Sequence, residues 1–128
     1  MQERNPFKPN RNREAVIEPA PLGALSHHRL LVWHKALALV RAVKASPVGD
    51  AELRDQATRA CRSSALNIAE GSALEGAAKR RHYGIARASA VETAAAYELA
   101  RALGETAAPG EVVGLAAEVA AMLSALVR

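Results

Sequence analysis

Aromatic residues are scarce in this chain: among its 128 residues there are only four, Phe7, Trp33, Tyr83 and Tyr97. Half of the residues are nevertheless hydrophobic, so a core must be built mainly from alanine, leucine and valine. Small side chains bury little apolar surface each, at roughly 25 cal/mol per Å², although they let helices approach closely. A core of this kind is marginal for a monomer, and the composition therefore favours self-association.

Cysteine is nearly absent, and so are segments that direct a protein to a membrane. The single Cys61 cannot form an intramolecular disulfide, and without a cluster of cysteines or histidines it indicates no metal site. His27 and His28 are adjacent, so their side chains diverge, and we interpret them as part of a tail. No apolar run approaches the ~20 residues of a membrane span, and the polar N-terminus lacks an apolar signal core. We expect a soluble cytoplasmic protein.

Catalytic motifs are missing as well. The sequence has no glycine-rich phosphate loop, no paired catalytic carboxylates and no metal motif. A nucleophilic Cys61 or Ser63 would need a positioned base, and the nearest candidate, His82, has no evident third partner. Cys61 borders an apolar face and is better explained as a small core residue. The sequence therefore predicts a protein that is not an enzyme and that binds no metal or cofactor.

Residues 1–29 contain prolines but no apolar periodicity. Pro6, Pro9, Pro19 and Pro21 lie among scattered arginines and asparagines, a composition typical of a disordered extension. Because the segment is mildly basic, it is either an arm that contacts nucleic acid or an inert leader, and the second interpretation is favoured. The folded domain is predicted over residues 30–128.

Beyond residue 29 the apolar pattern has a helical period that is broken three times, at 46–49, 71–76 and 104–110, each rich in glycine or proline. Asp50 is placed to cap the second helix and Gly71 to end it. No alternation typical of strands competes with this pattern. The helices are predicted over about 30–44, 50–71, 77–103 and 111–127. Short connections between four helices predict an all-α, up-down-up-down four-helix bundle.

Steps of three and four residues define the face that each helix should bury. The third helix has two such faces, and a helix that is apolar on two sides needs two partners, one of which can be another subunit. Its inner seam is Tyr83, Ala86, Ala90, Ala94 and Tyr97, and its second apolar surface is Ile85, Ala88, Ala96 and Leu99. The first helix is expected to bury Leu30, Trp33, Leu37, Val40 and Lys44, with Ala36 and Val43 widening the stripe. The last is expected to bury Val112, Leu115 or Ala116, Val119, Met122 or Leu123, and Leu126.

The second helix carries a polar stripe, Gln56, Ser63, Asn67 and Glu70, directly beside an apolar face that runs from Leu53 through Ala57, Ala60 and Ser64 to Ile68. Only Glu70 is charged, whereas a solvated stripe more typically carries lysine and glutamate, so we predict that this one is partly buried. One interpretation is that Ser63 and Asn67 hydrogen-bond to a neighbouring helix and fix the register of the bundle. Under that interpretation Glu70 pairs with Arg59 or Lys35. The alternative is a ligand site around Asn67 and Glu70.

The same stretch contains the pattern Gln-x-x-Arg-Ala-x-x-Ser-x-x-x-Asn-Ile-Ala-Glu-Gly over residues 56–71, preceded by Leu-Val-Trp-His-Lys-Ala at 31–36 and followed by Ile-Ala-Arg-Ala-Ser at 85–89. In this order the three pieces resemble the small four-helix-bundle proteins first noticed as reading frames inside intervening sequences of bacterial 23S ribosomal RNA genes. The chain departs from that family at His82, usually Phe, and at Ala88, usually Gly. The matched motif positions are Trp33, Lys35, Gln56, Arg59, Ser63, Asn67, Ile68, Glu70, Gly71 and Ser89.

The resemblance implies a homo-oligomer, in the form of a pentameric ring, and no settled biochemical activity. Related bundles are accessory proteins of reverse transcriptases in diversity-generating retroelements, where a basic ring engages nucleic acid and the polymerase. The resemblance therefore implies an adaptor that assembles with copies of itself and contacts RNA or DNA, together with a reverse transcriptase or another protein.

A basic cluster fits that expectation. Lys79, Arg80 and Arg81 open the third helix and Arg87 follows two turns after Arg80, in a chain with a net charge of +4. Cations at a helix N-terminus oppose the macrodipole, and an anionic partner would relieve this. Assembly would multiply the cluster into a ring that grips phosphates, and the lack of aromatic stacking residues predicts backbone-directed binding. The alternatives are a solvated basic turn and a protein-interaction scaffold without a nucleic-acid role.

Overall fold

The computed structural model describes residues 23–106 and 109–127. These residues form four α-helices and one short 3-10 turn, without a strand among them: η1 (Ser26–Arg29), α2 (Leu31–Ala45), α3 (Ala51–Ser72), α4 (Gly76–Ala102) and α5 (Gly110–Leu126). The predicted all-α fold is confirmed, and each helix boundary lies within about two residues of its predicted place. The extension predicted over residues 1–29 lies outside the described residues up to position 22.

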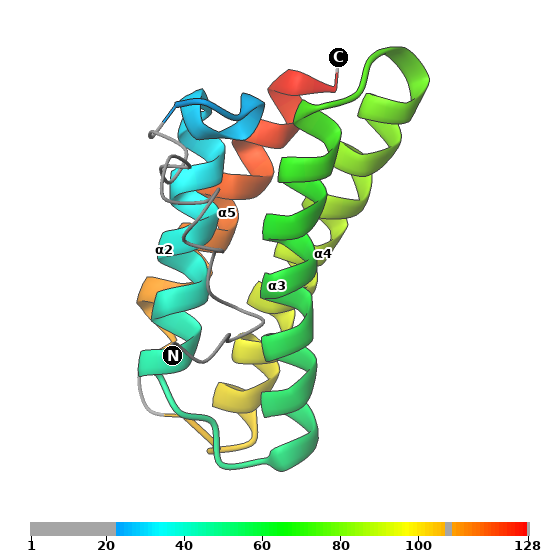
Figure 1. Ribbon diagram of the computed structural model, residues 1–128. Helices are drawn as coiled ribbons and strands as arrows, with labels where there is room; N and C mark the ends of the chain where they lie inside the picture. Colours follow the sequence, from blue (N-terminus) through cyan, green and yellow to red (C-terminus); the bar gives the residue numbers. More distant parts are fainter. Residues whose placement is uncertain (1–22, 107–108, 128) are drawn as a thin grey trace, which may run out of the picture.

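The helices form a closed ring of neighbours. α3 packs against α2 and α4, and α5 packs against α4 and α2. Successive helices run in opposite directions, so that α2 and α4 start at the end of the molecule where α3 and α5 finish (Figure 1). The predicted up-down-up-down four-helix bundle is therefore confirmed. At the opposite end the two remaining loops are joined by a hydrogen bond from Gly49 N–H to the Glu105 carbonyl, 2.8 Å long.

The residues predicted to cap and to end α3 have different outcomes. Asp50 caps α3 as expected, since its Oδ2 accepts a hydrogen bond from Leu53 N–H at 2.9 Å. Gly71, in contrast, does not end this helix, which continues to Ser72. Gly104 follows α4 with a φ of +73°, in the left-handed region where glycine is favoured.

Residues 23–29, which were predicted to belong to the extension, pack on the bundle. The 3-10 turn η1 contacts both α2 and α3. His28 Nδ1 accepts hydrogen bonds from the N–H groups of Gly23, at 3.0 Å, and Leu25, at 3.3 Å. His27 lies edge-on to Trp33, with ring centroids 4.5 Å apart. The two histidines are therefore part of a folded turn, and the interpretation as a tail was wrong.

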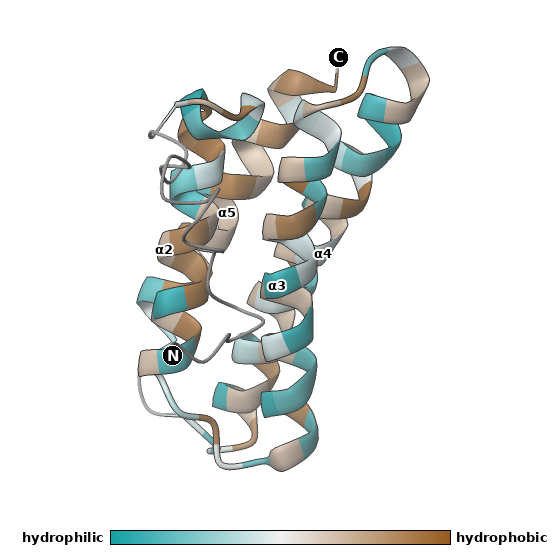
Figure 2. Cartoon of the chain, in the orientation of Figure 1, coloured by the Kyte–Doolittle hydropathy of each residue, from teal (hydrophilic) through white to brown (hydrophobic). Residues whose placement is uncertain are grey.

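The core has two levels, one above the other along the bundle axis. One surrounds Tyr97, Leu39 and Val112, and the other surrounds Ile68, Val119 and further residues of all four helices. Along α3, hydrophobic bands alternate with hydrophilic ones (Figure 2), as an amphipathic helix requires. Cys61 is buried with 2% of its surface exposed, so it is a small core residue as predicted.

The buried face of α2 agrees with the predicted one only at Ala36 and Val43. The buried residues are Val32, Ala36, Leu39, Ala42 and Val43, whereas Leu30, Trp33, Leu37 and Val40 are half-buried and Lys44 is exposed. Apolar residues surround this helix on most sides, so its sequence period does not single out one face. The neighbouring helices determine which face is buried.

The other predicted faces are largely confirmed. On α4, Tyr83, Ala86, Ala90 and Tyr97 are buried, while Ala94 is half-buried. Ala96 was assigned to the second apolar surface, but only 7% of it is exposed, and it belongs to the core. On α5 the buried residues are Val112, Ala116, Val119 and Leu123, and Leu126 is 43% exposed, against prediction.

Candidate functional site

The polar stripe of α3 forms hydrogen bonds with α4. Ser89 Oγ, on α4, donates to Ser63 Oγ at 2.9 Å. Asn67 Nδ2 donates to the Ser63 carbonyl at 2.9 Å and to Ser63 Oγ at 3.2 Å. The Asn67 carboxamide oxygen lies 2.8 Å from Nδ1 of His82, again on α4. These contacts support the predicted role of the stripe in setting helix register, with α4 as the partner.

The direction of these hydrogen bonds fixes the tautomer of His82. A carboxamide oxygen can only accept, so His82 Nδ1 must carry the proton that faces Asn67. The same nitrogen lies 3.9 Å from Oε2 of Glu70, whose side chain is exposed. Lys35 pairs with Glu118 of α5 at 3.2 Å. The predicted pairing of Glu70 with Arg59 or Lys35 was therefore wrong, because its neighbour across the helix interface is His82.

Further motif residues are spread over the interior and the surface of the bundle. Ile68 is fully buried and Gly71 is buried against α4, whereas Gln56 and Trp33 are half-buried and Arg59 is exposed. Sequence reasoning missed the polar role of Ser64, which it placed on the apolar face. Ser64 is completely buried, and its Oγ donates to the Ala86 carbonyl of α4 at 2.9 Å. The α3–α4 interface is thus the most polar part of the interior.

The predicted basic residues lie at the start of α4. Lys79 is half-buried, whereas Arg80, Arg81 and Arg87 are exposed. Arg87 Nε donates to Ser124 Oγ of α5 at 2.6 Å, which holds this guanidinium in the groove between the two helices. The three adjacent cations thus lie in the first turns of α4, and Arg87 lies two turns after Arg80. The contact with Ser124 could not be foreseen, because it joins positions 37 residues apart.

Groups that could perform catalysis or hold a metal do not converge in the described part of the chain. There, no three His, Cys, Asp or Glu side chains are placed to hold a metal ion. The Cys61 thiol donates to the Thr58 carbonyl, and burial raises its pKa above the ordinary value, so the unreactive thiol form is favoured. Within the same residues, no helix has the length and apolar character needed to cross a bilayer.

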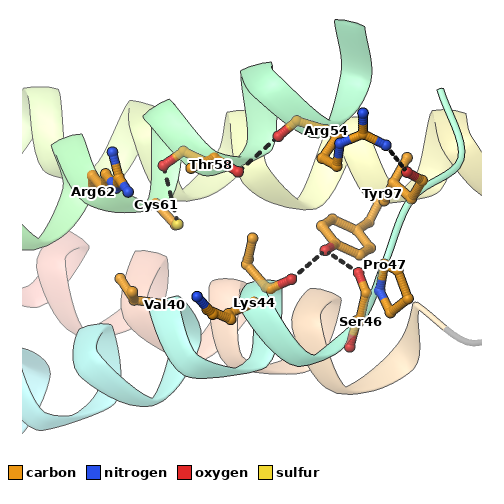
Figure 3. Close-up of a pocket in the computed structure, with 11 residues that line it drawn as sticks. Val40, Lys44, Ser46, Pro47, Arg54, Thr58, Cys61, Arg62 and Tyr97 are labelled. Atoms are coloured by element: carbon orange, nitrogen blue, oxygen red, sulfur yellow. Dashed lines mark hydrogen bonds between the residues drawn. The ribbon is translucent and has the colours of Figure 1, made fainter. Parts of the chain in front are cut away.

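One concave site was not foreseen from the sequence. A pocket of about 330 Å³ opens between α2 and α3, with Tyr97 of α4 at its base (Figure 3). Its residues come from 40–48, 54–62 and 97, so only the packing of three helices brings them together. The pocket lies near the end of α2, away from the basic start of α4 and from Asn67.

Sequence comparison then identifies the family. A family profile described as 23S rRNA-intervening sequence protein matches residues 28–125. The chain belongs to the 23S rRNA-intervening sequence protein family. The match begins within η1 and covers nearly all of the four helices, so the resemblance in residues 31–89 extends into α5 as well. A search of curated proteins finds no match. The polar α3–α4 interface and the basic start of α4 are therefore found in a member of this family.

Proposed function

We propose that this family member is a non-enzymatic, homo-oligomeric adaptor that binds the backbone of RNA or DNA through Lys79, Arg80, Arg81 and Arg87. The observation that carries the proposal is the projection of the first turns of α4 beyond the end of α5. This projection places a cluster of cations where an extended polyanion can reach it. Its further partner would be a reverse transcriptase or another protein that acts on the same nucleic acid.

The projection follows from the contact between Arg87 and Ser124. α5 ends only two residues after Ser124, at Leu126, whereas α4 extends eleven residues before Arg87, back to Gly76. From this contact α4 therefore runs about nine residues, or roughly two and a half helical turns, farther toward this end than α5 does. Figure 1 shows the loop between α3 and α4 at the same end of the molecule as the end of α5. Arg80 and Arg81 lie in these first turns and are exposed.

Self-association is supported by the outer side of α4. Ile85 is 38% exposed, Leu99 50% and Leu103 60%. Ile85, Ala88, Ala95 and Leu99 follow alternating steps of three and four residues through Glu92, the spacing of a helix–helix seam. A second copy of the chain would cover these residues, and a ring of copies would repeat the basic cluster around its rim. The family membership favours five copies.

The test is binding of the full chain to a mixed-sequence single-stranded RNA and to duplex DNA over a salt series. We expect log K to fall linearly with log salt, by roughly 0.7 per RNA phosphate contacted and 0.9 per DNA phosphate. Arg80→Ala/Arg81→Ala should weaken binding at every salt concentration and flatten the slope. The matched control is Arg41→Ala/Arg101→Ala, which removes the same charge from exposed sites elsewhere. Lys79 is left intact because it is half-buried.

Two results would contradict the proposal. One is equal weakening by both double variants, because net charge rather than the α4 cluster would then govern binding. The other is an absence of binding by the wild-type protein at low salt. The second result would favour the alternative function, a protein-interaction scaffold. Proteins that bind the same basic surface would then be sought.

A further inference from the structure

The pocket between α2 and α3 has no role in the proposed function. Eleven described residues line it, and it holds about 330 Å³, the lower end of the range for small-molecule sites, roughly 300–1,000 Å³. It lies near the ends of α2 and α3 that are joined by the 46–50 loop, far along the bundle from Arg80. The lining residues are Val40, Val43, Lys44, Ser46, Pro47, Val48, Arg54, Thr58, Cys61, Arg62 and Tyr97.

The inner part of the pocket is apolar in effect, because its polar atoms already have partners. The Tyr97 hydroxyl lies 2.7 Å from the Ser46 carbonyl and 3.1 Å from that of Val43, and donates to these oxygens. The Cys61 thiol donates to the Thr58 carbonyl, and the Thr58 hydroxyl donates to that of Arg54. What remains for an occupant is hydrocarbon surface, from Val40, Val43, Val48 and the ring of Tyr97.

The mouth of the pocket is cationic. Lys44, Arg54 and Arg62 all line it, all three are exposed, and no aspartate or glutamate is found among the described lining residues. Arg54 Nη1 donates to the Val48 carbonyl at 2.8 Å, which fixes its guanidinium at the rim and leaves further N–H groups free to donate. Figure 3 shows Lys44 on α2 across from Arg62 and Cys61 on α3. Three like charges around one opening favour an anion between them.

We propose that this pocket binds a small organic anion with an apolar body, such as a medium-chain carboxylate. The hydrocarbon part would enter between Val40, Val43 and Tyr97, and the carboxylate would stay at the mouth with Lys44, Arg54 and Arg62. A cation is disfavoured by the charge of the rim. A nucleic-acid phosphate backbone is disfavoured by the apolar character of the interior.

The experiment is a calorimetric titration of the full chain with sodium octanoate, with hexanoate and decanoate for chain length and with octanol and octylammonium for charge. Each added methylene that enters the pocket should tighten Kd by about fourfold, until the interior is full. Octanol should bind at least tenfold more weakly than octanoate, and octylammonium should not bind. The NMR signals of the Tyr97 ring should shift during the octanoate titration.

The variant Lys44→Ala/Arg62→Ala should weaken octanoate binding at least tenfold while octanol is unaffected. Its matched control is Arg41→Ala/Arg59→Ala, which removes the same charge from the same two helices at exposed positions that do not line the pocket. Thermal unfolding of both variants verifies that they fold. Equal binding of octanoate and octanol, equal weakening by the control variant, or no saturable binding at millimolar octanoate would each overturn the proposal.

Discussion

Gly71 of α3 lies directly against the ring of Tyr83 on α4. A Cβ atom built on Gly71 would be 2.7 Å from two ring carbons of Tyr83 and 3.2 Å from Cβ of His82. Real Cβ atoms do not approach ring carbons so closely, so only glycine permits this spacing of the two helices. The motif glycine is thus a packing residue inside the helix.

Substituting Gly71 should therefore destabilise the protein. Gly71→Ala should lower the free energy of unfolding by about 1–3 kcal/mol through overpacking against Tyr83. Gly84→Ala is the matched control, since a Cβ there meets no atom within 4 Å, and it should instead stabilise α4 by up to about 1 kcal/mol. Urea denaturation measures both. A change of the same sign and size in the two variants would show that helix propensity, rather than the contact with Tyr83, decides the effect.

The hydrogen bonds of Asn67 predict a second loss of stability. Asn67→Leu removes the donor to Ser63 and the acceptor for His82 Nδ1, which should cost about 1–3 kcal/mol because partly buried polar atoms lose their partners. Leu66→Gln, at a neighbouring position that is 60% exposed, should change stability by less than about 0.5 kcal/mol. Thermal unfolding and mass measurement check both. An unchanged melting temperature in Asn67→Leu would argue that the polar stripe has no role in packing.

Stability should fall in alkaline solution. Burial raises the pKa of Cys61 and of Tyr83 above their usual values, and burial followed by the nearby Cys61 raises that of Tyr97. The unfolded chain therefore releases these protons at lower pH than the folded chain does. Their contribution to stability is complete below the unfolded pKa values and is lost as pH rises, starting at about pH 8.5 for cysteine and about pH 10 for tyrosine.

Chemical denaturation between pH 7 and 11 measures this dependence. Cys61→Ala should flatten the curve between about pH 8.5 and 10 and leave the steeper loss above about pH 10. A wild-type stability that does not change up to pH 11 would contradict the burial of these three groups.

The outer side of α4 makes the oligomeric state testable. Ile85→Lys/Leu99→Lys introduces two charges into the apolar seam and should reduce the mass in solution to that of a monomer, 13.5 kDa. Leu31→Lys, at an exposed leucine of α2 (63%), should leave the mass of the assembly unchanged. Multi-angle light scattering gives the answer. Retention of the wild-type mass by the double variant would place the contact between subunits elsewhere.

Much of the fold could be predicted because its signals are local. Asp50, Gly104 and the proline at position 109 act on their own helix ends, and boundaries predicted from them lie close to the observed ones. The buried face of α2 was predicted only at Ala36 and Val43, since Val32 and Trp33 can both be buried and only the neighbouring helices choose between them. Gly71 was misassigned because its role depends on Tyr83, which follows twelve residues later on the adjacent helix.

The candidate sites likewise separate into those whose residues are close in the sequence and those whose residues come from separate segments. The basic cluster of Lys79, Arg80 and Arg81 is contiguous in sequence and could be recognised there. The pocket at Tyr97 combines three separate segments, and the partner of Glu70 is set by the antiparallel alignment of α3 and α4, so neither follows from spacing along a single helix.

The hydrogen bonds of Tyr97 also have a consequence for the order in which the chain can become structured. The carbonyls of Val43 and Ser46, at the end of α2, accept from a hydroxyl that lies more than fifty residues later in the sequence. During synthesis, the end of α2 therefore leaves the ribosome before its tyrosine donor exists. This tie between the first and third helices of the bundle can form only after most of α4 has been made.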